Sequence, residues 1–262
     1  MNNRGPHGSH IGDEKGMRRQ LIYMCPLLLL ASAAWGSTCA NTTLDVYTAT
    51  SFSCTLDGLT FSDFSFLAPT GMPTSNEVDL VPVNDGTDVG FMFDGPFSAP
   101  AGFSDDAILS YMISQSTGSN TTMTGDTVSL LSAGASGTGA AAQISEGICT
   151  TTAQSNGACV PPSNSYNLFV DYNSNGSGTQ SDSVTFASPA TTQAVIKNIV
   201  TDGGTGTSGG ALISSFENTT QVSGGGSTGG GPVPEPGSML MLGSGLIATS
   251  MLLRRKVRKN TL

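Results

Sequence analysis

Histidine is missing from residues 37–253, and Lys197 is the only basic residue there. The two histidines of the chain, His7 and His10, both precede Met17. Without histidine this stretch cannot form a Ser-His-Asp or Cys-His catalytic site, nor a zinc site built on imidazole. A pair of carboxylates is the catalytic arrangement that stays open, but the sequence marks no particular pair of Asp and Glu.

Negative charge dominates the same stretch. It holds 17 Asp and Glu residues against one lysine, a net charge near −16, whereas the whole chain has a formal net charge of −9. The other nine basic residues lie near the two ends. Because such a surface repels phosphate backbones and anionic headgroups, we do not expect nucleic-acid binding. An acidic surface of this kind is suited to solubility and to weak binding of divalent cations.

The N-terminal residues have the composition of an export signal. Residues 1–16 are polar and patternless, which indicates an extended start or an expression remnant; the first and the second methionine both stay open as the true start. Residues 17–36 combine a basic beginning, an apolar run and small residues, Ala34 and Gly36, at positions −3 and −1 of a cleavage site. A cut after Ala40 and a buried helix are the alternatives. We expect export through the Sec translocon.

Four cysteines follow this signal: Cys39, Cys54, Cys149 and Cys159. An even number in an exported chain favours disulfides over a metal site, and no Cys-x-x-Cys spacing is present. Four cysteines permit three pairings, of which local pairing, Cys39 with Cys54 and Cys149 with Cys159, is the simplest. A loop of about 15 residues closed in this way contributes about 3 kcal/mol in the chain-entropy account.

Residues 37–223 have the pattern of an all-β ectodomain. Short apolar runs alternate with polar residues at a period of two, and Gly, Pro, Asn and Asp separate the runs. The alternating apolar positions are Ala107, Leu109, Tyr111 and Ile113; Val128 and Leu130; Leu168, Val170 and Tyr172; and Val184 and Phe186. No sustained helical stripe occurs in this region. We predict one antiparallel β-sandwich, with an up-and-down barrel as the rival.

One loop of the ectodomain has a partial calcium-binding pattern. Asp171, Asn173, Asn175 and Gly176 match the first half of an EF-hand loop. Asp182 stands where a bidentate Glu is usual, and the flanks have the pattern of strands instead of helices. With calcium bound, Asp171 and Asp182 would be ligands, and Asn173 and Asn175 would complete the set. The alternative is a polar hairpin loop, and no other cofactor is expected.

The ectodomain also carries four Asn-x-Ser/Thr sequons, at Asn41, Asn120, Asn175 and Asn218. Such sequons arise by chance in a chain rich in Ser, Thr and Asn, and bacterial glycosylation seldom uses them. We interpret all four as polar, exposed turns.

Four segments of distinct composition make up the C-terminus. A Gly/Ser linker at residues 224–232 separates the ectodomain from the tail. Residues 233–236 are a rigid segment with two prolines, residues 237–253 are uncharged and apolar, and residues 254–259 are a basic cluster. As a helix, the apolar segment would span about 25 Å, slightly less than a hydrocarbon core, so its insertion alone is marginal. The basic cluster predicts that this end stays in the cytoplasm.

This order of elements resembles the PEP-CTERM sorting signal, over residues 233–259. The resemblance implies recognition by exosortase, a membrane-embedded cysteine transpeptidase of Gram-negative bacteria. It implies that residues 237–253 form a transmembrane retention helix between a recognition box and a basic stop. The box is Val233, Pro234, Glu235 and Pro236, and the stop is Arg254, Arg255 and Lys256. A tail anchor that is never cleaved is the alternative.

Together these features predict a non-enzymatic protein of the cell surface or extracellular matrix. It would pass through the inner membrane, be processed by exosortase and associate with exopolysaccharide. One alternative is a secreted module that binds calcium or an ordered surface such as ice, which would need a flat, exposed ladder of Thr. Another is a carbohydrate-active enzyme, which would need two carboxylates about 5–10 Å apart in a cleft.

Overall fold

The computed structural model describes residues 37–150, 154–155, 158–159 and 164–224. The predicted export signal, most of the linker and the whole sorting tail lie outside these residues. Within the part that is described, no helix is both long and apolar enough to cross a membrane.

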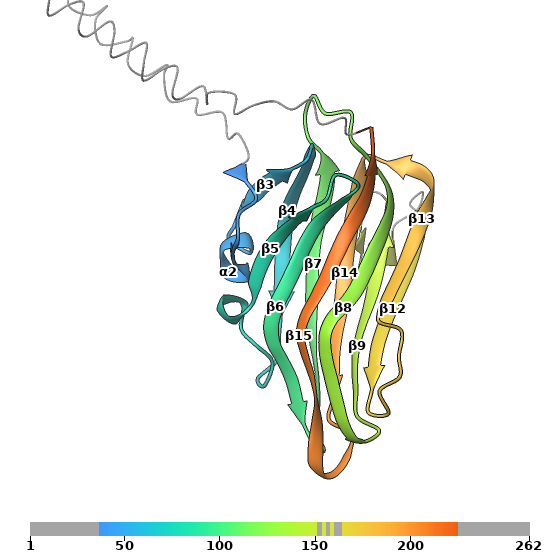
Figure 1. Ribbon diagram of the computed structural model, residues 1–262. Helices are drawn as coiled ribbons and strands as arrows, with labels where there is room; N and C mark the ends of the chain where they lie inside the picture. The colour runs from blue at the N-terminus through green and yellow to red at the C-terminus, as the bar shows by residue number, and fades with distance from the viewer. Residues whose placement is uncertain (1–36, 151–153, 156–157, 160–163, 225–262) are drawn as a thin grey trace, which may run out of the picture. The chain divides into compact units, whose positions relative to one another are not determined.

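The described chain forms two β-sheets that pack face to face (Figure 1). The seven-stranded sheet runs in the order β1 (Ser37–Thr38), β3 (Ser53–Leu56), β4 (Leu59–Leu67), β7 (Ser104–Gln115), β14 (Thr192–Asp202), β9 (Ala141–Cys149) and β12 (Ser165–Asn173). The six-stranded sheet runs in the order β13 (Ser181–Ala190), β8 (Thr122–Thr138), β15 (Thr205–Ser223), β6 (Asp88–Pro100), β5 (Asp79–Asn84) and β2 (Thr42–Thr43). Neighbouring strands are antiparallel, except that β1 is parallel to β3.

Three small elements complete the described structure. They are the helix α2 (Leu44–Tyr47), the 3-10 turn η2 (Ser75–Glu77) and a hairpin of β10 (Gln154–Ser155) with β11 (Ala158–Cys159). The antiparallel β-sandwich predicted from the sequence is confirmed. The two sheets end in separate edge strands in this part of the chain, so the rival barrel is wrong.

The period-two pattern places side chains as expected, because successive residues of a strand face opposite sides of the sheet. On β7, Ala107, Leu109, Tyr111 and Ile113 all lie in the core, whereas Ile108 between them is 37% exposed. The burial patterns of β8 and β12 alternate in the same way, with Val128 and Leu130 and with Leu168 and Val170 inside.

The two strands that matter most for the site lie in the middle of opposite sheets. β14 pairs with β7 and β9, and β15 pairs with β6 and β8. A tight turn connects β14 to β15, and Gly204 in this turn has φ +72°, a conformation that costs glycine little. Side chains that point inward from β14 and β15 therefore face each other at the centre of the sandwich.

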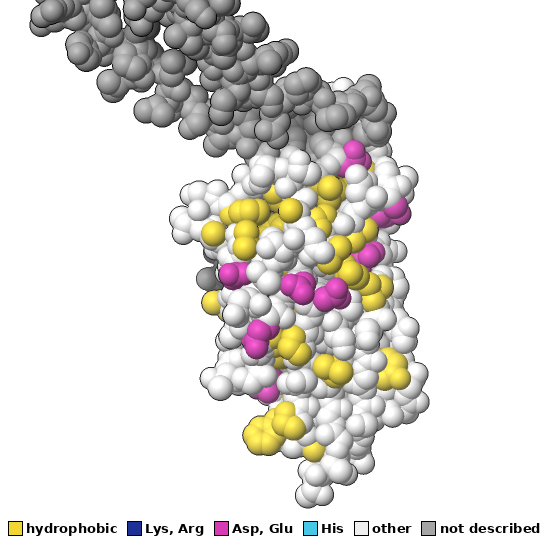
Figure 2. Space-filling model, turned by 60° about the vertical axis from the view of Figure 1, so that its left-hand side comes forward, with side chains coloured by type: hydrophobic (Ala, Val, Ile, Leu, Met, Phe, Trp, Pro, Cys, Tyr) yellow, Lys and Arg dark blue, Asp and Glu magenta, His cyan; other side chains and the backbone are white. Residues whose placement is uncertain are grey.

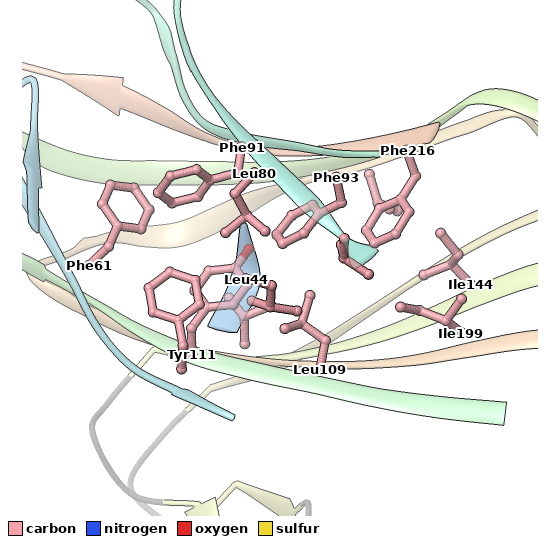
Figure 3. Packing of buried hydrophobic residues seen from close by; sticks show 14 of the residues in the cluster. Leu44, Phe61, Leu80, Phe91, Phe93, Leu109, Tyr111, Ile144, Ile199 and Phe216 are labelled. Carbon is pink, nitrogen blue, oxygen red and sulfur yellow. The ribbon is translucent and has the colours of Figure 1, made fainter. Parts of the chain in front are cut away.

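Aromatic side chains fill much of the space between the sheets (Figure 3). The rings of Phe61 and Phe91 meet edge to face at 4.9 Å, and those of Phe93 and Phe216 stack at 4.8 Å between centroids. Tyr111 lies on the other side of the core, with its ring 6.4 Å from that of Phe93. Such contacts add about 0.5–1.5 kcal/mol per pair beyond the burial of apolar area.

The predicted disulfide between Cys39 and Cys54 is confirmed, with the two Cα atoms 4.8 Å apart. It ties the N-terminal segment to β3, the strand next to the edge of the seven-stranded sheet. Cys149 is disulfide-bonded as well. Its pairing with Cys159 stays a prediction, because the side chain of Cys159 lies outside the described residues.

Replacing Phe91 with Ala tests the aromatic core. Phe91 is fully buried against Tyr47, Phe61 and Phe93, so its loss should leave a cavity and lower the free energy of unfolding by about 3–5 kcal/mol. The control is Phe103→Ala at a ring that is 64% exposed, which should change stability by no more than about 0.5 kcal/mol. Urea unfolding measures both; equal losses would contradict this packing.

Candidate functional site

A cluster of charged and amide side chains lies inside the sandwich, where an apolar core is expected. We call it the inter-sheet cluster: Lys197 on β14, Glu146 on β9, and Asp126 and Asn218 on β8 and β15 of the opposite sheet. Each of the four side chains belongs to a residue that is at most 2% exposed. Lys197 and Glu146 are direct cross-strand neighbours, so their side chains leave the sheet side by side.

The members of the inter-sheet cluster bind one another directly. Lys197 Nζ forms an ion pair with Glu146 Oε2. Asn218 Nδ2 donates to Asp126 Oδ1, to the other oxygen of Glu146, Oε1, at 3.3 Å, and to the carbonyl oxygen of Thr127 at 2.9 Å. One carboxyl group, that of Glu146, therefore holds both the amine of one sheet and the amide of the other.

Tyr111 completes the contacts of Asn218. Its hydroxyl group donates a hydrogen bond to Asn218 Oδ1. Burial raises the pKa of Tyr111 well above its ordinary value, and the charges of Glu146 and Asp126 raise it further. The phenol therefore stays protonated and remains a donor at every ordinary pH.

Asp126 is the most perturbed carboxyl group of the cluster. Gln193 Nε2 donates to its Oδ2, and so does the hydroxyl group of Thr220 at 3.1 Å. Burial raises the pKa of Asp126 well above the usual range and the charge of Glu146 adds to this, while Lys197 and the amide donors oppose it. A proton on Asp126 leaves the Lys197–Glu146 pair electrically balanced, which suits a site shielded from water.

This cluster contains the pair of carboxylates that the enzyme hypothesis needs, but in the wrong place. Asp126 and Glu146 both bind the amide of Asn218, yet they are 0% and 2% exposed. A glycosidase needs its two acids in a cleft that admits the sugar. These two acids face the interior of the sandwich.

Lys197 stands out in the sequence as the single basic residue of residues 37–253, but its burial was not predicted. Glu146 and Asp126 were not predicted as site residues. A signal was present, because Val195, Lys197 and Ile199 share one face of a strand and both apolar neighbours are buried. The interpretation of Asn218 as an exposed sequon is wrong, since it lies on the inward face of β15 beside Phe216.

The other three sequons, at Asn41, Asn120 and Asn175, are exposed as expected. The Thr ladder of the surface-binding hypothesis is a different matter. Thr219 and Thr220 on β15 are 4% and 1% exposed, so these two threonines cannot belong to an exposed ladder.

The predicted calcium loop is a hairpin closed by its own hydrogen bonds. Asp171 accepts from the backbone N–H of Thr179 at 2.7 Å and from Asn173 Nδ2 at 2.6 Å. Asn175 Oδ1 accepts from the backbone N–H of Ser177 at 2.9 Å. These contacts agree with the polar hairpin that the sequence left as the alternative.

Asp182, the fourth candidate ligand, lies on β13 and accepts from the backbone N–H of Phe169 at 2.9 Å. Across the described residues, no three His, Cys, Asp or Glu side chains come together as a metal site would require. Calcium binding by this loop stays a prediction.

The outer face of the seven-stranded sheet carries exposed apolar side chains beside polar ones. On the seven-stranded sheet, one row of cross-strand neighbours runs over β4, β7, β14, β9 and β12, and we call it the outer row. Its members are Leu67, Ile108, Asn198, Ser145 and Phe169. Leu67, Ile108 and Phe169 are among the exposed large hydrophobic residues of the domain, so the outer row combines apolar and hydroxyl or amide groups.

The outer face of the six-stranded sheet is acidic. Glu217 is partly buried there, and burial, followed by the charges of Asp85 and Asp88, raises its pKa. On the face drawn in Figure 2, acidic side chains lie between apolar ones and no Lys or Arg side chain is visible. A shallow depression of about 540 Å³ near the end of this sheet is lined by small residues such as Ala99, Ala135 and Gly210. No titratable side chain lines it.

The sequence-predicted sorting residues, Val233 to Pro236 and Arg254 to Lys256, lie outside the described residues. A comparison with protein families covers the same segment of the chain. The PEP-CTERM protein-sorting motif matches residues 232–256, which confirms the resemblance drawn from the sequence. No curated protein matches the chain.

Two solved structures show remote similarity. One is TmCBM61 in complex with beta-1,4-galactotriose, with 10% identity and a TM-score of 0.32 over 61% of this chain and 90% of that chain. The other is the enzymatically active domain of tailspike protein 4 of bacteriophage CBA120, with 12% identity and a TM-score of 0.22 over 62% of this chain and 19% of that chain. At such low TM-scores neither likeness bears on function.

Replacing Asp126 with Asn tests the electrostatics of the inter-sheet cluster. Because the folded state raises the pKa of Asp126, its contribution to stability is complete below the unfolded pKa, about 3.9, and is lost as the pH rises through the folded pKa. We expect the D126N protein to gain stability relative to the unchanged protein as the pH rises from about 4. Urea unfolding at a series of pH values measures this.

The matched control is Asp45→Asn at an exposed carboxyl group. Its free energy of unfolding should run parallel to that of the unchanged protein across the pH series, because the change lies at an exposed position outside the inter-sheet cluster. If the free energies of unfolding of D126N and the unchanged protein changed in parallel with pH, the pKa of Asp126 would be the same in the folded and unfolded states. That result would contradict the electrostatics described for the cluster.

Proposed function

The chain carries a PEP-CTERM protein-sorting motif at residues 232–256, and from this premise we propose an exported, non-enzymatic surface protein that associates with neutral exopolysaccharide. The motif is the observation that carries the proposal. It implies export and sorting by exosortase. In our proposal the ectodomain lies on the far side of the inner membrane. The final location is the cell surface or the extracellular matrix.

Charge supports the choice of a neutral polysaccharide. Lys197 is the only basic residue among those described, and it is buried in an ion pair. No basic side chain of the described surface is therefore present to pair with a uronate or sulfate group. An anionic polymer would meet only repulsion from the acidic side chains.

The outer row supplies the contacts that a neutral sugar needs. Hydroxyl-rich sugars bind through hydrogen bonds to polar groups and through apolar packing against side chains, aromatic rings above all. Phe169, 45% exposed, lies beside Ser145 on the neighbouring strand, and Ile108 and Asn198 continue the row. We assign this face to the polysaccharide.

A non-enzymatic role is supported by the position of the acids. The carboxyl groups of Asp126 and Glu146, which both bind the amide of Asn218, are buried within the inter-sheet cluster and lie away from the outer row. The proposed role is therefore binding, with the acidic surface maintaining solubility outside the cell.

Replacing Glu235 with Ala tests the sorting step. Glu235 supplies the only charge in the recognition box, so its loss should prevent processing and leave a larger chain in the membrane fraction. Ser227→Ala, in the Gly/Ser linker that precedes the box, is the matched control and should be processed normally. Electrophoresis of membrane and extracellular fractions measures size and location together. Unchanged size and location in E235A would favour the uncleaved anchor.

Replacing Phe169 with Ala tests the binding face. We expect the exported protein to be retarded in gels that contain a neutral polysaccharide, and the loss of one exposed ring to reduce this retardation several-fold, by about 1 kcal/mol. Phe103→Ala removes an exposed ring outside the outer row and should leave retardation unchanged. Equal behaviour of the two variants would remove the outer row as the binding face. Retardation only by anionic polymers would contradict a neutral ligand while leaving the sorting step intact.

A further inference from the structure

The inter-sheet cluster contains a potential nucleophile, the side-chain amine of Lys197. Lys197 is fully buried, and its Nζ is held by Glu146 Oε2. A lysine attacks a carbonyl group only in its neutral form, so the reaction needs a base in contact with the amine. Glu146 is the carboxylate in direct contact with this amine.

The same cluster polarises a carboxamide. Asn218 Oδ1 accepts the hydrogen bond of the Tyr111 hydroxyl group, while Asn218 Nδ2 faces Asp126 and lies 3.3 Å from Glu146 Oε1. Acyl transfer requires a donor at the oxygen that becomes negative and an acid beside the nitrogen that leaves. Both requirements are met around Asn218.

We propose that Lys197 and Asn218 form an intramolecular isopeptide bond, promoted by Glu146, whose two oxygens hold the amine and the amide nitrogen. The bond between Lys197 Nζ and Asn218 Cγ forms, and the bond between Cγ and Nδ2 breaks. Of the three protons on the charged amine, one stays on the new amide and two leave with Nδ2 as ammonium. Glu146 carries them between the two nitrogens and is unchanged at the end, so no other reactant is needed.

The surroundings favour this chemistry over hydrolysis. The stacked rings of Phe93 and Phe216 pack near Asn218 on the same side of the core, and Tyr111 is nearly fully buried. Excluding water strengthens the electrostatic contacts inside a site and prevents side reactions. Because Tyr111 keeps its proton, its hydroxyl group donates throughout the reaction.

The bond would join the centres of the two sheets covalently. Lys197 belongs to β14 of the seven-stranded sheet and Asn218 to β15 of the six-stranded sheet. A covalent link of this kind limits the separation of the sheets in the unfolded chain, as a disulfide does, but resists reducing agents. The inference does not depend on what the ectodomain binds.

Peptide mass spectrometry of the full chain tests the bond. The protein is purified, reduced, alkylated, denatured and digested with trypsin, for which Lys197 is the only site within residues 37–253. An acylated Lys197 should resist trypsin. After a further cut before Asp202, the peptides that carry Lys197 and Asn218 should stay joined, at a mass about 17 Da below their sum, which is the mass of ammonia.

Two results would overturn the assignment. Cleavage by trypsin at Lys197 with unshifted peptide masses would show that no bond forms. A joined pair that contains Asp126 in place of Asn218, with a loss of about 18 Da for water, would show that the partner is wrong.

Three variants sharpen the test. Asn218→Ala should abolish the mass shift, whereas Asn175→Ala, at an exposed asparagine, should retain it. Glu146→Gln should leave the peptides unlinked, and a cooperative urea-unfolding transition in this variant reports that the domain still folds. A folded E146Q protein that is still linked would contradict the role of Glu146. If a variant fails to fold, the masses from the unchanged protein still decide for or against the bond.

Discussion

Before the proposed bond forms, the ion pair between Lys197 and Glu146 is the constraint on which the rest of the sandwich depends. Two charges inside a protein are costly to desolvate and persist only when they meet partners with good geometry. Here the partners come from the other sheet, since Asn218 binds Glu146 and Asp126 binds Asn218. The two sheets must therefore pack in the one alignment that brings these side chains together.

This constraint explains how an ectodomain with so polar a sequence obtains a defined core. Aromatic contacts such as Phe93 with Phe216 supply burial but tolerate small shifts between the sheets. The inter-sheet cluster does not tolerate such shifts, because a shifted sheet would leave a buried charge unpaired. The acidic outer surface, by contrast, contributes solubility and little to the packing.

The sequence predicted the features that are local or periodic. Alternation on β7 follows from the pleat of a strand, and the pairing of Cys39 with Cys54 follows from their closeness in the chain. The inter-sheet cluster was not predicted, because Glu146 and Lys197 become neighbours only when β9 pairs with β14. A polar residue in an alternating strand is ordinarily assigned to the solvent face, and the position of Asn218 contradicts that assignment. The sorting motif was predicted because its order along the chain is itself the signal.

A double-mutant cycle at Lys197 and Glu146 tests the central claim most directly. The free energy of unfolding is measured for Lys197→Met, Glu146→Leu and the double variant, with the unlinked form of the unchanged protein, identified by its peptide masses, as the reference. Each single change leaves a buried partner without its counter-charge and should cost about 3–5 kcal/mol. The account predicts that the double variant loses much less than the sum of the singles, with a coupling of at least about 2 kcal/mol. Additive losses would show that the two side chains act independently, and would contradict the account.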